Sequence, residues 1–411
     1  MRIAFADLLY SWPPHGGADV DVYRTIEGLR ALGHEVHLFG AACGATWERG
    51  RFAPDELPFP ATRLDFSTPS FNRRQVPKRF RAAVDAWRPQ VVCVTDGFLL
   101  KPYLIDALAH YPTISRYYAY EAVCARDILC FKDGAPCPNN FLRTPDVCRR
   151  CAFDRLGPEV RQWHLRAWTH EYLAARAFMP HYHRRALNAL RNLSAVIVSN
   201  DRMKAQLEGF NHRIHIMPGG VDTDAFSEQP PPPKGHDVRK VILMAGRIED
   251  PVKGLGILYQ AARELAVRRS DFEVWVTGAN VRVPEAGWFK TVGWHGQDGL
   301  KELYRQADIC VVPSIWEEPF GLIAVEAMAA AKPVCASRVG GLQRIVRDGQ
   351  TGFLFERGDT IGLADRLERL LDDAALRERM GAAGRSVACD EYDWDRVIAR
   401  HWPPLLDEVL P

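Results

Sequence analysis

Residues 311–334 read VVPSIWEEPFGLIAVEAMAAAKPV, a pattern that predicts a strand, a loop and a helix beginning near Gly321. Short aliphatic runs of this kind recur along the chain between longer segments of helical periodicity, which is the pattern of parallel strands joined by crossover helices. Glu318 lies in the loop, and Glu326 follows eight positions later in the helix. The stretch therefore predicts a parallel α/β sheet with acidic side chains near its carboxyl edge.

The same alternation continues in both directions and falls into two series. We expect strands at 2–6, 35–39, 91–95, 113–116 and 195–199, and then at 240–245, 272–277, 309–313 and 333–336. Four consecutive prolines, Pro230 to Pro233, separate the series, and proline can continue neither a helix nor a central strand. A long surface loop within one domain is the alternative, but a new strand follows at once. The sequence therefore predicts two Rossmann-like, doubly wound domains.

The composition is that of an ordinary globular protein. The chain has 411 residues, more than the roughly 250 to 300 that a single core reaches, which fits two domains. With 47% hydrophobic and 25% charged residues, it does not fit a collagen-like, disordered or disulfide-scaffold protein. A net charge of +2 gives no reason to expect a nucleic acid as partner.

The amino-terminal residues predict no secretory signal. In MRIAFADLLYSWPPHGG, Asp7 interrupts the apolar run, and Pro13 and Pro14 end it. No stretch of the sequence approaches the roughly 18 to 20 apolar residues that cross a bilayer. We therefore expect a cytoplasmic protein, and disulfides are uncommon in that reducing compartment.

Gly16 and Gly17 end the loop between the first predicted strand and the helix that follows. Because they have no side chains, a ligand could approach the backbone N–H groups and the positive end of the helix dipole. A plain tight turn would use the same two glycines, so the pair alone leaves both interpretations open.

Two cations follow the first strand of the second series. In VILMAGRIEDPVKGLGIL, Arg247 lies at the strand end and Lys253 six positions later. Ligands of doubly wound sheets bind outside the carboxyl ends of the strands, and the fork of an arginine suits a diphosphate. The alternative is a solvated loop with ordinary surface charges. A further segment, SRVGGLQRIVRDGQTGFLF, adds Gly340, Gly341 and a turn at 348–352.

Glu318 and Glu326 in the setting PFGLIAVE, together with Arg247 and Lys253, resemble family 4 of the retaining glycosyltransferases. The segments HGGAD, GHEVHLF, PGGVDTDAF, ADICVVPS and VGGLQRIVRDGQTGFLF extend this resemblance over nearly the whole chain. The resemblance implies the architecture called GT-B, in which two Rossmann-like domains face each other across a cleft that closes on the substrates. It also implies transfer of a sugar from a nucleotide diphosphate sugar, of the UDP or GDP type, with retention of configuration.

The resemblance and the proline run together set the expected domain boundaries. An amino-terminal, acceptor-side domain covers 1–226 and holds a cysteine-rich, metal-binding insertion at 117–155. A proline-rich linker at 227–239 leads to a nucleotide-sugar-binding domain at 240–392. The last segment, 393–411, would pack back on the first domain, as it does in relatives.

The resemblance also implies roles for individual residues. Arg247 and Lys253 would bind the diphosphate and stabilise the charge that it gains on leaving, without a catalytic metal. Glu318 would contact the donor sugar and Glu326 the ribose hydroxyls. The remaining donor contacts would come from the backbone of Phe320, Gly321 and Leu322 and from Gly16 and Gly17 of the first domain. The D-x-D triplet at 222–224 matches a metal-binding pattern, but we interpret it as a turn.

Other interpretations of these residues stay open. Glu318 and Glu326 could merely cap and solvate a helix. A nucleotide-sugar epimerase of the same fold would keep the donor site and change the reaction, whereas a non-catalytic module would only bind the nucleotide sugar. Many relatives have a His-Asp pair on the acceptor side, where this chain has Tyr118, Tyr120 and Glu121. The acceptor is therefore expected only to be a glycan, a lipid-linked compound or a small molecule.

Five of the ten cysteines lie close together in the sequence, at Cys124, Cys130, Cys137, Cys148 and Cys151. The C-x-x-C pair and the upstream cysteines suit a tetrahedral thiolate site, for which zinc is the usual metal. Some family 4 relatives resemble the chain here in a pattern that leaves Cys130 extra. That resemblance implies a structural zinc held by Cys124, Cys137, Cys148 and Cys151, with Cys130 as a substitute. An iron–sulfur cluster, a disulfide and unmetallated thiols are the alternatives.

Two stretches mix basic and aromatic residues. FNRRQVPKRFR spans 71–81, and RQWHLRAWTHEYLAARAFMPHYHRR spans 161–185. Segments of this kind can settle on an anionic bilayer surface, where each nearby cation contributes about 1 kcal/mol. The stretches thus suggest peripheral contact with the inner face of a membrane. Solvated helices, whose arginine stems cover the core, are the alternative.

Overall fold

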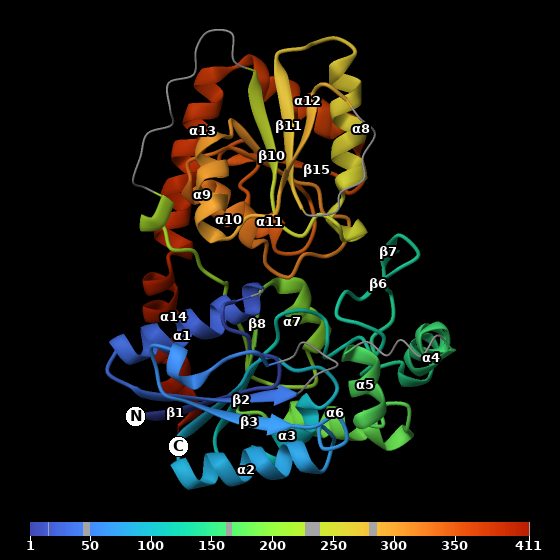
Figure 1. Ribbon diagram of the computed structural model, residues 1–411, viewed down its shortest axis with the longest axis vertical. Helices are drawn as coiled ribbons and strands as arrows, with labels where there is room; N and C mark the ends of the chain where they lie inside the picture. The colour runs from blue at the N-terminus through green and yellow to red at the C-terminus, as the bar shows by residue number, and fades with distance from the viewer. Residues whose placement is uncertain (15, 44–49, 162–166, 227–238, 279–285, 411) are drawn as a thin grey trace. The chain divides into compact units, whose positions relative to one another are not determined.

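The computed structural model describes residues 1–14, 16–43, 50–161, 167–226, 239–278 and 286–410. The chain divides into two compact units (Figure 1). The first consists of Met1–Lys132, Pro136–Pro218 and Val397–Pro411, and the body of the second is Gly219–Arg396. The predicted linker at 227–239 lies outside the described residues apart from Arg239.

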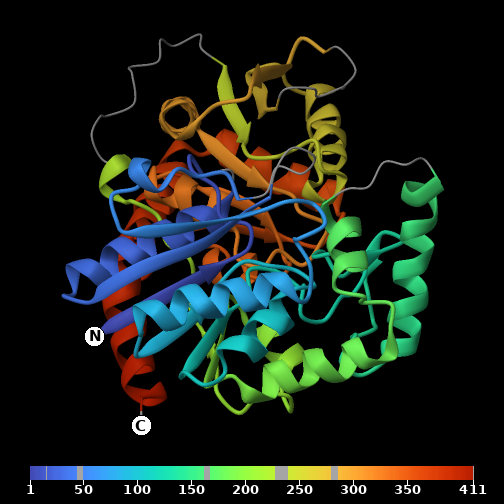
Figure 2. The same cartoon turned by 60° about the horizontal axis from the view of Figure 1, so that its bottom comes forward.

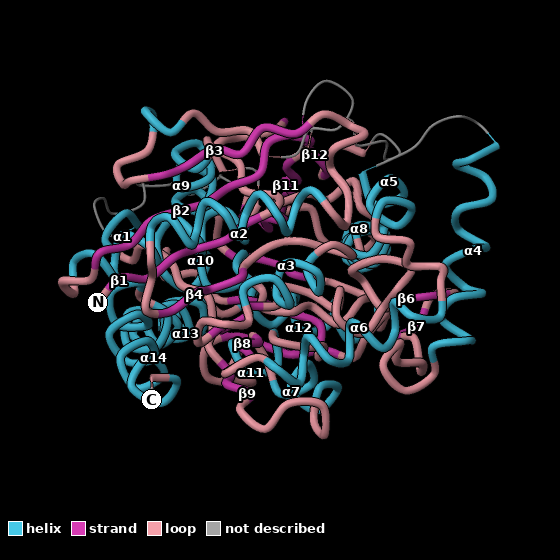
Figure 3. Tube along the Cα trace, turned by 90° about the horizontal axis from the view of Figure 1, so that it is seen from below, coloured by secondary structure: helices cyan, strands magenta, loops and turns pink. Residues whose placement is uncertain are grey.

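The first unit is built on a parallel sheet of seven strands. In chain order they are β1 (Arg2–Asp7), β2 (Glu35–Cys43), β3 (Ala61–Phe66), β4 (Val91–Val94), β5 (Thr113–Arg116), β8 (Ala195–Val198) and β9 (Ile214–Ile216). Their order across the sheet is β3-β2-β1-β4-β5-β8-β9, so that the chain winds from β1 to β3 on one side and then from β4 to β9 on the other (Figure 3). All the pairings in this sheet are parallel, as the crossover pattern predicts.

The helices of the first unit are α1 (Gly17–Ala31), α2 (Gln75–Trp87), α3 (Lys101–Leu108), α4 (Pro145–Arg161), α5 (Ala167–Ala174), α6 (Pro180–Asn192) and α7 (Asp201–Leu207). A two-stranded sheet, β6 (Phe131–Lys132) and β7 (Ala135–Pro136), precedes α4. Helix α14 (Trp394–Val409) begins in the second unit and ends in the first. The carboxyl-terminal helix runs beside α1 (Figure 2). Its Ile398 packs so closely on α1 that a Cβ on Gly28 would lie 2.4 Å from the Ile398 Cδ1.

The second unit has a parallel sheet of six strands, β10 (Lys240–Met244), β11 (Phe272–Thr277), β12 (Phe289–Gly293), β13 (Ile309–Val312), β14 (Val334–Ser337) and β15 (Gly352–Phe355). The order is β12-β11-β10-β13-β14-β15, which makes β10 and β13 the central pair. The crossover rule for open sheets places a ligand at this switch of direction, outside the carboxyl ends of β10 and β13.

Helices cover both faces of the second sheet. They are α8 (Leu255–Ala266), α9 (Gln297–Gln306), α10 (Leu322–Ala329), α11 (Leu342–Ile345), α12 (Thr360–Asp372) and α13 (Ala374–Val387). Successive side chains of β10 point to opposite faces, since Val241 and Leu243 pack with α9, α10 and α13, and Ile242 and Met244 pack with α8 and α12 (Figure 1). Burial on both faces explains why the strand reads as a continuous apolar run.

The stretch at 71–81, which was predicted to expose both basic and aromatic side chains, exposes only the basic ones. Phe71 and Phe80 are 1% and 0% exposed, because they lie on the core side of this segment. Arg74, Lys78 and Arg81 are exposed, so the stretch presents cations without aromatic rings. In the part of the chain that the structure describes, no helix combines the length and the apolarity needed to cross a bilayer.

Candidate functional site

Two loops of the second unit meet outside the carboxyl ends of β10 and β13. The Ile315 N–H donates to the Val252 carbonyl at 2.8 Å, which ties the loop after β13 to the turn that follows β10. Gly254 is left-handed, with φ at +82°, and a Cβ there would lie 1.8 Å from the Pro313 carbonyl oxygen. Only glycine allows this approach, because the space that a side chain would take is filled by backbone.

Lys253 and Glu318 form an ion pair across these two loops. The Lys253 Nζ lies 2.8 Å from Oε1 of Glu318 and 3.2 Å from its Oε2. Ser314 Oγ and the Trp316 Nε1 each donate to Oε2 at 2.8 Å. Two residues that the sequence predicted at one site are thus in direct contact.

The Glu318 carboxylate is held in its ionised form. Its burial pushes the pKa upward, but the charge of Lys253 and the hydrogen bonds from Lys253, Ser314 and Trp316 outweigh burial and bring the pKa below its usual value. A carboxylate that is charged and fixed by several donors can face a positively charged reaction centre without reorganising.

Arg247 lies at the carboxyl end of β10, where the sequence predicts it. Arg247 is exposed, and its side chain forms no hydrogen bond or ion pair with any described residue. The donors of its guanidinium thus have no partner among the described residues. The neighbouring Gly246 is fixed to β11, because its N–H donates to Thr277 Oγ1 at 2.9 Å.

Helix α10 begins beside this ion pair. Gly321 is left-handed at φ +117°, and a Cβ there would lie 2.6 Å from the Leu342 side chain. The N–H groups of Phe320 and Gly321 donate to no described residue, and Leu322 opens the helix with an N–H that has no partner inside it. These backbone donors and the helix dipole suit an anion, as the sequence predicts for this segment.

Glu317 is a contributor that the sequence prediction missed. It is 7% exposed, accepts a hydrogen bond from the Gly340 N–H at 2.8 Å, and pairs with Arg357. The Gly341 N–H donates to the Glu318 carbonyl at 2.7 Å. Glu317 therefore anchors the glycine pair after β14 against the loop that carries Glu318.

Glu326 lies on α10 and is 8% exposed. The Tyr304 hydroxyl donates to its Oε2 at 2.9 Å, and burial raises the Glu326 pKa to about 7 despite this bond. Glu318 and Glu326 thus differ in charge near neutral pH, although both lie on the same segment. Tyr304 was also absent from the predicted site.

The D-x-D triplet at 222–224 forms a turn, as we interpreted it from the sequence. Asp222 Oδ1 accepts from the Ala225 N–H at 3.2 Å at the start of a short 3₁₀ helix, Asp224–Phe226. The Thr223 hydroxyl donates to Asp393 Oδ2 at 2.8 Å.

Gly16 and Gly17 stand at the amino end of α1 in the first unit. The Gly16 N–H already donates to the Asp19 Oδ2 at 3.2 Å, and Asp19 also accepts from the Ser11 N–H at 3.0 Å. The pair therefore forms a capped helix start. Its contribution to a donor site stays a prediction.

Acidic and basic side chains gather near the carboxyl edge of the first sheet. Asp96 follows β4, and burial together with the charges of Asp7 and Glu121 raises its pKa to about 8. Tyr118 donates its hydroxyl to Asp21 at 3.0 Å, and Arg116 pairs with the same carboxylate at 2.5 Å. The tyrosine and glutamate that replace the usual His-Asp pair thus belong to ionic networks.

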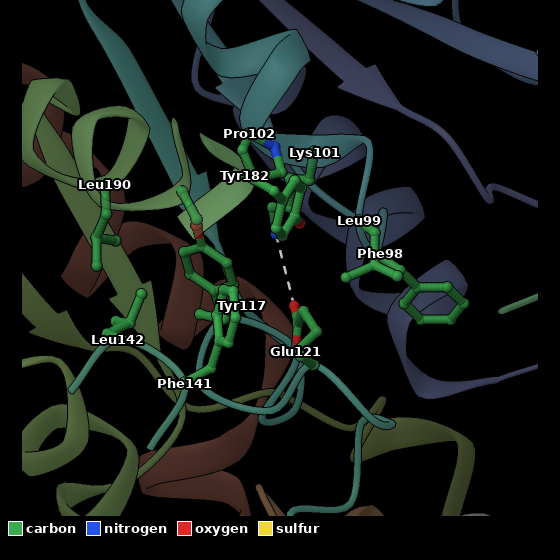
Figure 4. Close-up of a pocket in the computed structure, with 13 residues that line it drawn as sticks. Phe98, Leu99, Lys101, Pro102, Tyr117, Glu121, Phe141, Leu142, Tyr182 and Leu190 are labelled. Carbon is green, nitrogen blue, oxygen red and sulfur yellow. Dashed lines mark ion pairs between the residues drawn. The ribbon is translucent and has the colours of Figure 1, made fainter. Parts of the chain in front are cut away.

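A small cavity of about 20 Å³ lies within the first unit (Figure 4). Lys101 and Glu121 line it, with 3.6 Å between Nζ and Oε1, and their side chains are 1% and 5% exposed. Phe141 and Tyr182 line other parts of the wall. A space of this size holds about one water molecule, so it is too small for a sugar ring.

The predicted zinc site is not supported. Cys124, Cys130, Cys137, Cys148 and Cys151 are all described, but no three or more His, Cys, Asp or Glu side chains in the described ranges are placed to share a metal ion. The thiols meet different neighbours instead. Cys124 and Cys130 are free thiols that share a hydrogen bond, and Cys124 lies 3.7 Å from Asp127, whereas Cys148 lies 3.9 Å from Thr144. The spacing of the cysteines did not determine how the intervening loop arranges them.

Comparison with protein families agrees with the sequence resemblance. The family model described as Glycosyltransferase Family 4 matches residues 15–225, and the one described as Glycosyl transferases group 1 matches residues 226–387. A phosphatidyl-myo-inositol mannosyltransferase of Mycobacterium leprae is 33% identical over 215 residues, which are 51% of this chain and 57% of the relative. A D-inositol 3-phosphate glycosyltransferase of an Arthrobacter species is 38% identical over 209 residues, which are 46% and 49% of the two chains. The chain thus spans about half the length of the curated relatives it matches.

Solved structures share the whole fold. Sucrose-phosphate synthase from Thermosynechococcus elongatus aligns with a TM-score of 0.66 at 20% identity and covers 97% of both chains. Anabaena HepE in complex with UDP and glucose aligns with a TM-score of 0.67 at 17% identity, over 99% of this chain and 100% of HepE. The two parallel α/β sheets therefore form the GT-B fold.

Proposed function

Since the chain belongs to glycosyltransferase family 4, we propose that it transfers a sugar from a nucleoside diphosphate sugar to an acceptor hydroxyl. The observation that carries this proposal is the Lys253–Glu318 ion pair at the sheet edge where Arg247 also lies, an arginine that pairs with no described residue. Cations at the switch point of a doubly wound sheet suit a diphosphate, and a fixed carboxylate beside them suits the glycosyl centre. The names of the curated relatives, which refer to inositol compounds, support the class of reaction, and HepE, which shares the fold, has been crystallised in complex with UDP-glucose.

In the proposed reaction the bond between the sugar C1 and the diphosphate oxygen breaks, and a bond from C1 to the acceptor oxygen forms. The leaving diphosphate gains negative charge, which Lys253, Arg247 and the N–H groups at the start of α10 stabilise. The acceptor proton passes to the leaving diphosphate on the same face of the sugar, which gives retention of configuration. Glu318 stabilises the positive charge that develops at C1.

The donor is a UDP- or GDP-sugar in this proposal. Glu326 accepts hydrogen bonds from the ribose hydroxyls, and Phe320, Gly321 and Leu322 bind the diphosphate through their backbone. The protein's own cations supply the positive charge, so we expect turnover to persist in EDTA.

A panel of UDP-, GDP-, ADP- and TDP-sugars tests the proposal. A thermal-shift assay identifies the nucleobase of the donor, because a ligand that binds only the folded protein raises the stability of the protein. Release of nucleoside diphosphate is then measured with and without polyol, inositol phosphate and glycolipid acceptors. Release that depends on acceptor supports transfer. Interconversion of free nucleotide sugars supports the epimerase, and binding without turnover across the panel supports the non-catalytic module.

We also propose peripheral contact of the first unit with an anionic membrane. Phe153 on α4 is 50% exposed, Leu173 on α5 is 40% exposed and Met179 is 37% exposed, beside the exposed Arg176. The Phe153 and Phe178 rings lie 6.3 Å apart, which links the two segments. Apolar side chains with a cation among them fit the surface of anionic lipids.

Cosedimentation with phosphatidylcholine vesicles, with and without phosphatidylglycerol, tests this contact. The protein should bind only the anionic vesicles, and Phe153→Asp with Leu173→Asp should abolish binding. Ile361→Asp is the matched control, because Ile361 is 65% exposed on the second unit. Equal effects of the control and the double variant would contradict the proposed surface.

A further inference from the structure

Tyr304 is a fully buried residue of α9 whose hydroxyl reaches the acidic side chain of a neighbouring helix. It is 0% exposed, and it donates to Oε2 of Glu326 at 2.9 Å. Its ring packs edge-on against Phe226, with 5.9 Å between the ring centroids. This packing fixes the ring, so the hydroxyl has a defined position.

The Glu326 carboxylate has few partners. Among the residues that the structure describes, the Tyr304 hydroxyl is its one hydrogen-bond donor, and no cation pairs with it. The Cys310 thiol of β13 is the other titratable group near this tyrosine, and burial raises the pKa of both Cys310 and Tyr304, which keeps them neutral. Glu318, by contrast, has three donors, one of which is charged. One oxygen of Glu326 is thus occupied, and Oε1 remains as an acceptor.

We propose that Tyr304 is a positioning residue for nucleotide binding, because its hydroxyl holds Oε2 of Glu326 and leaves Oε1 to accept the ribose hydroxyls of the donor. The inference rests on the proposed function of Glu326. In this proposal Tyr304, on α9, orients the Glu326 side chain on α10, and Tyr304 itself touches no substrate.

The arrangement links nucleotide binding to pH. Two hydroxyl donors need an ionised carboxylate, and burial places the Glu326 pKa at about 7 in the unliganded protein. Below that pH the carboxyl group must lose a proton before the nucleotide binds. The affinity for UDP or GDP therefore rises with pH up to about 7 and is constant above it.

Tyr304→Phe keeps the buried ring and removes the donor. The ionised form of Glu326 then loses its one hydrogen bond, so its pKa rises and the midpoint of the affinity profile moves to higher pH. If the midpoint moves up by about one pH unit, nucleotide binding becomes about tenfold weaker at pH values below the midpoint and stays nearly unchanged at pH 9. 3-Fluorotyrosine at position 304 is a nearly isosteric second variant. Its more acidic hydroxyl is a stronger donor, so the midpoint moves to lower pH.

Calorimetric titration with UDP and GDP between pH 5.5 and 9 tests the proposal. Tyr259→Phe is the matched control, because Tyr259 packs on Trp288 in the same unit and its hydroxyl forms no hydrogen bond with any described residue. The two Tyr304 variants should shift the midpoint in opposite directions, and the control should not shift it. A loss of affinity that is equal at every pH, or no loss, would overturn the positioning role.

Glu326→Ala distinguishes a failure of the Tyr304 role from a failure of the ribose role of Glu326. If this variant weakens nucleotide binding at pH 8 but the Tyr304 variants leave the profile unchanged, the role of Tyr304 fails and the proposed function stands. If Glu326→Ala binds UDP and GDP as well as the original protein does, the ribose role of Glu326 fails, and the inference fails with it.

Discussion

Lys253 Nζ lies 2.8 Å from Oε1 of Glu318, so the unliganded second unit already joins the turn after β10 to the loop after β13 by an ion pair. The carboxylate is then ionised and oriented before any donor arrives. Under the proposed function, a diphosphate would bring further negative charge and share the Lys253 ammonium, and Arg247 would supply a second cation that no described residue neutralises. The ion pair would then prepare both the anion site and the carboxylate.

Lys253→Gln should reduce turnover by about 10²- to 10³-fold, because the leaving diphosphate loses a fixed charge. Lys290→Gln is the matched control. Lys290 also pairs with a glutamate, Glu273, at 2.7 Å, but its side chain is 52% exposed on the edge strand β12. Steady-state kinetics with the donor identified by thermal shift check the prediction. Equal rates for the two variants would contradict the role of Lys253.

Gly254→Ala should destabilise the protein by more than about 3 kcal/mol, because the new Cβ would lie 1.8 Å from the Pro313 carbonyl and the backbone is left-handed there. Gly256→Ala, two positions along in α8, meets nothing within 4 Å and should stabilise the helix by up to about 1 kcal/mol. Urea unfolding of the pair measures both effects. A mild effect at Gly254 would mean that the two loops are not in contact.

Glu326→Gln should stabilise the unliganded protein at pH 8 and have little effect at pH 4.5. A glutamate with a pKa of about 7 when folded and about 4.3 when unfolded loses stability as the pH rises between these values. The loss is nearly complete at pH 8 and amounts to about 4 kcal/mol, and an uncharged amide avoids it. Thermal melts at the two pH values measure the difference. A stabilisation that is independent of pH would show that the carboxyl group does not titrate near neutrality.

Glu317→Ala should cost about 2 to 4 kcal/mol, because it leaves the Gly340 N–H and the Arg357 guanidinium without their shared partner. Glu317→Gln keeps the acceptor for the N–H and should lose less. The KM for the donor should rise in the alanine variant, because Glu317 anchors the loop that carries Glu318 to the glycine pair after β14. Unfolding curves and donor KM values check the two effects separately. Identical behaviour of the two variants would indicate that the carboxylate charge has no part in the anchor.

The central strands of both sheets could be predicted from the sequence, but several edge strands could not. β10 and β13 are buried on both faces, so they appear as continuous apolar runs. β12 has the exposed Lys290 and Thr291 in its middle. In β3, the exposed Arg63 and Asp65 alternate with buried apolar residues, so neither strand contains a continuous apolar run. Strands with one solvated face carry a weaker pattern, which explains why these were missed.

The donor-side residues could be placed at one sheet edge from the sequence, whereas their contacts could not. The position of Lys253 and Glu318 follows from the strand ends, but their ion pair depends on how two loops fold against each other. Tyr304 lies in the helical segment 297–306 and resembles an ordinary core residue, so only its contact with Glu326 distinguishes it. Asp96 did carry a signal, since it follows the run at 91–95 at a carboxyl edge where ligands bind.

Hydrogen–deuterium exchange with saturating UDP or GDP tests the central claim most directly, because it locates nucleotide binding without assuming any reaction. We predict slower exchange in peptides that cover 246–254 and 314–326 of the second unit, and unchanged exchange in α13, which lies outside the proposed site. The same protection should be lost in Lys253→Gln. Protection elsewhere, or none at either segment when the nucleotide is bound, would contradict the assignment of the donor site.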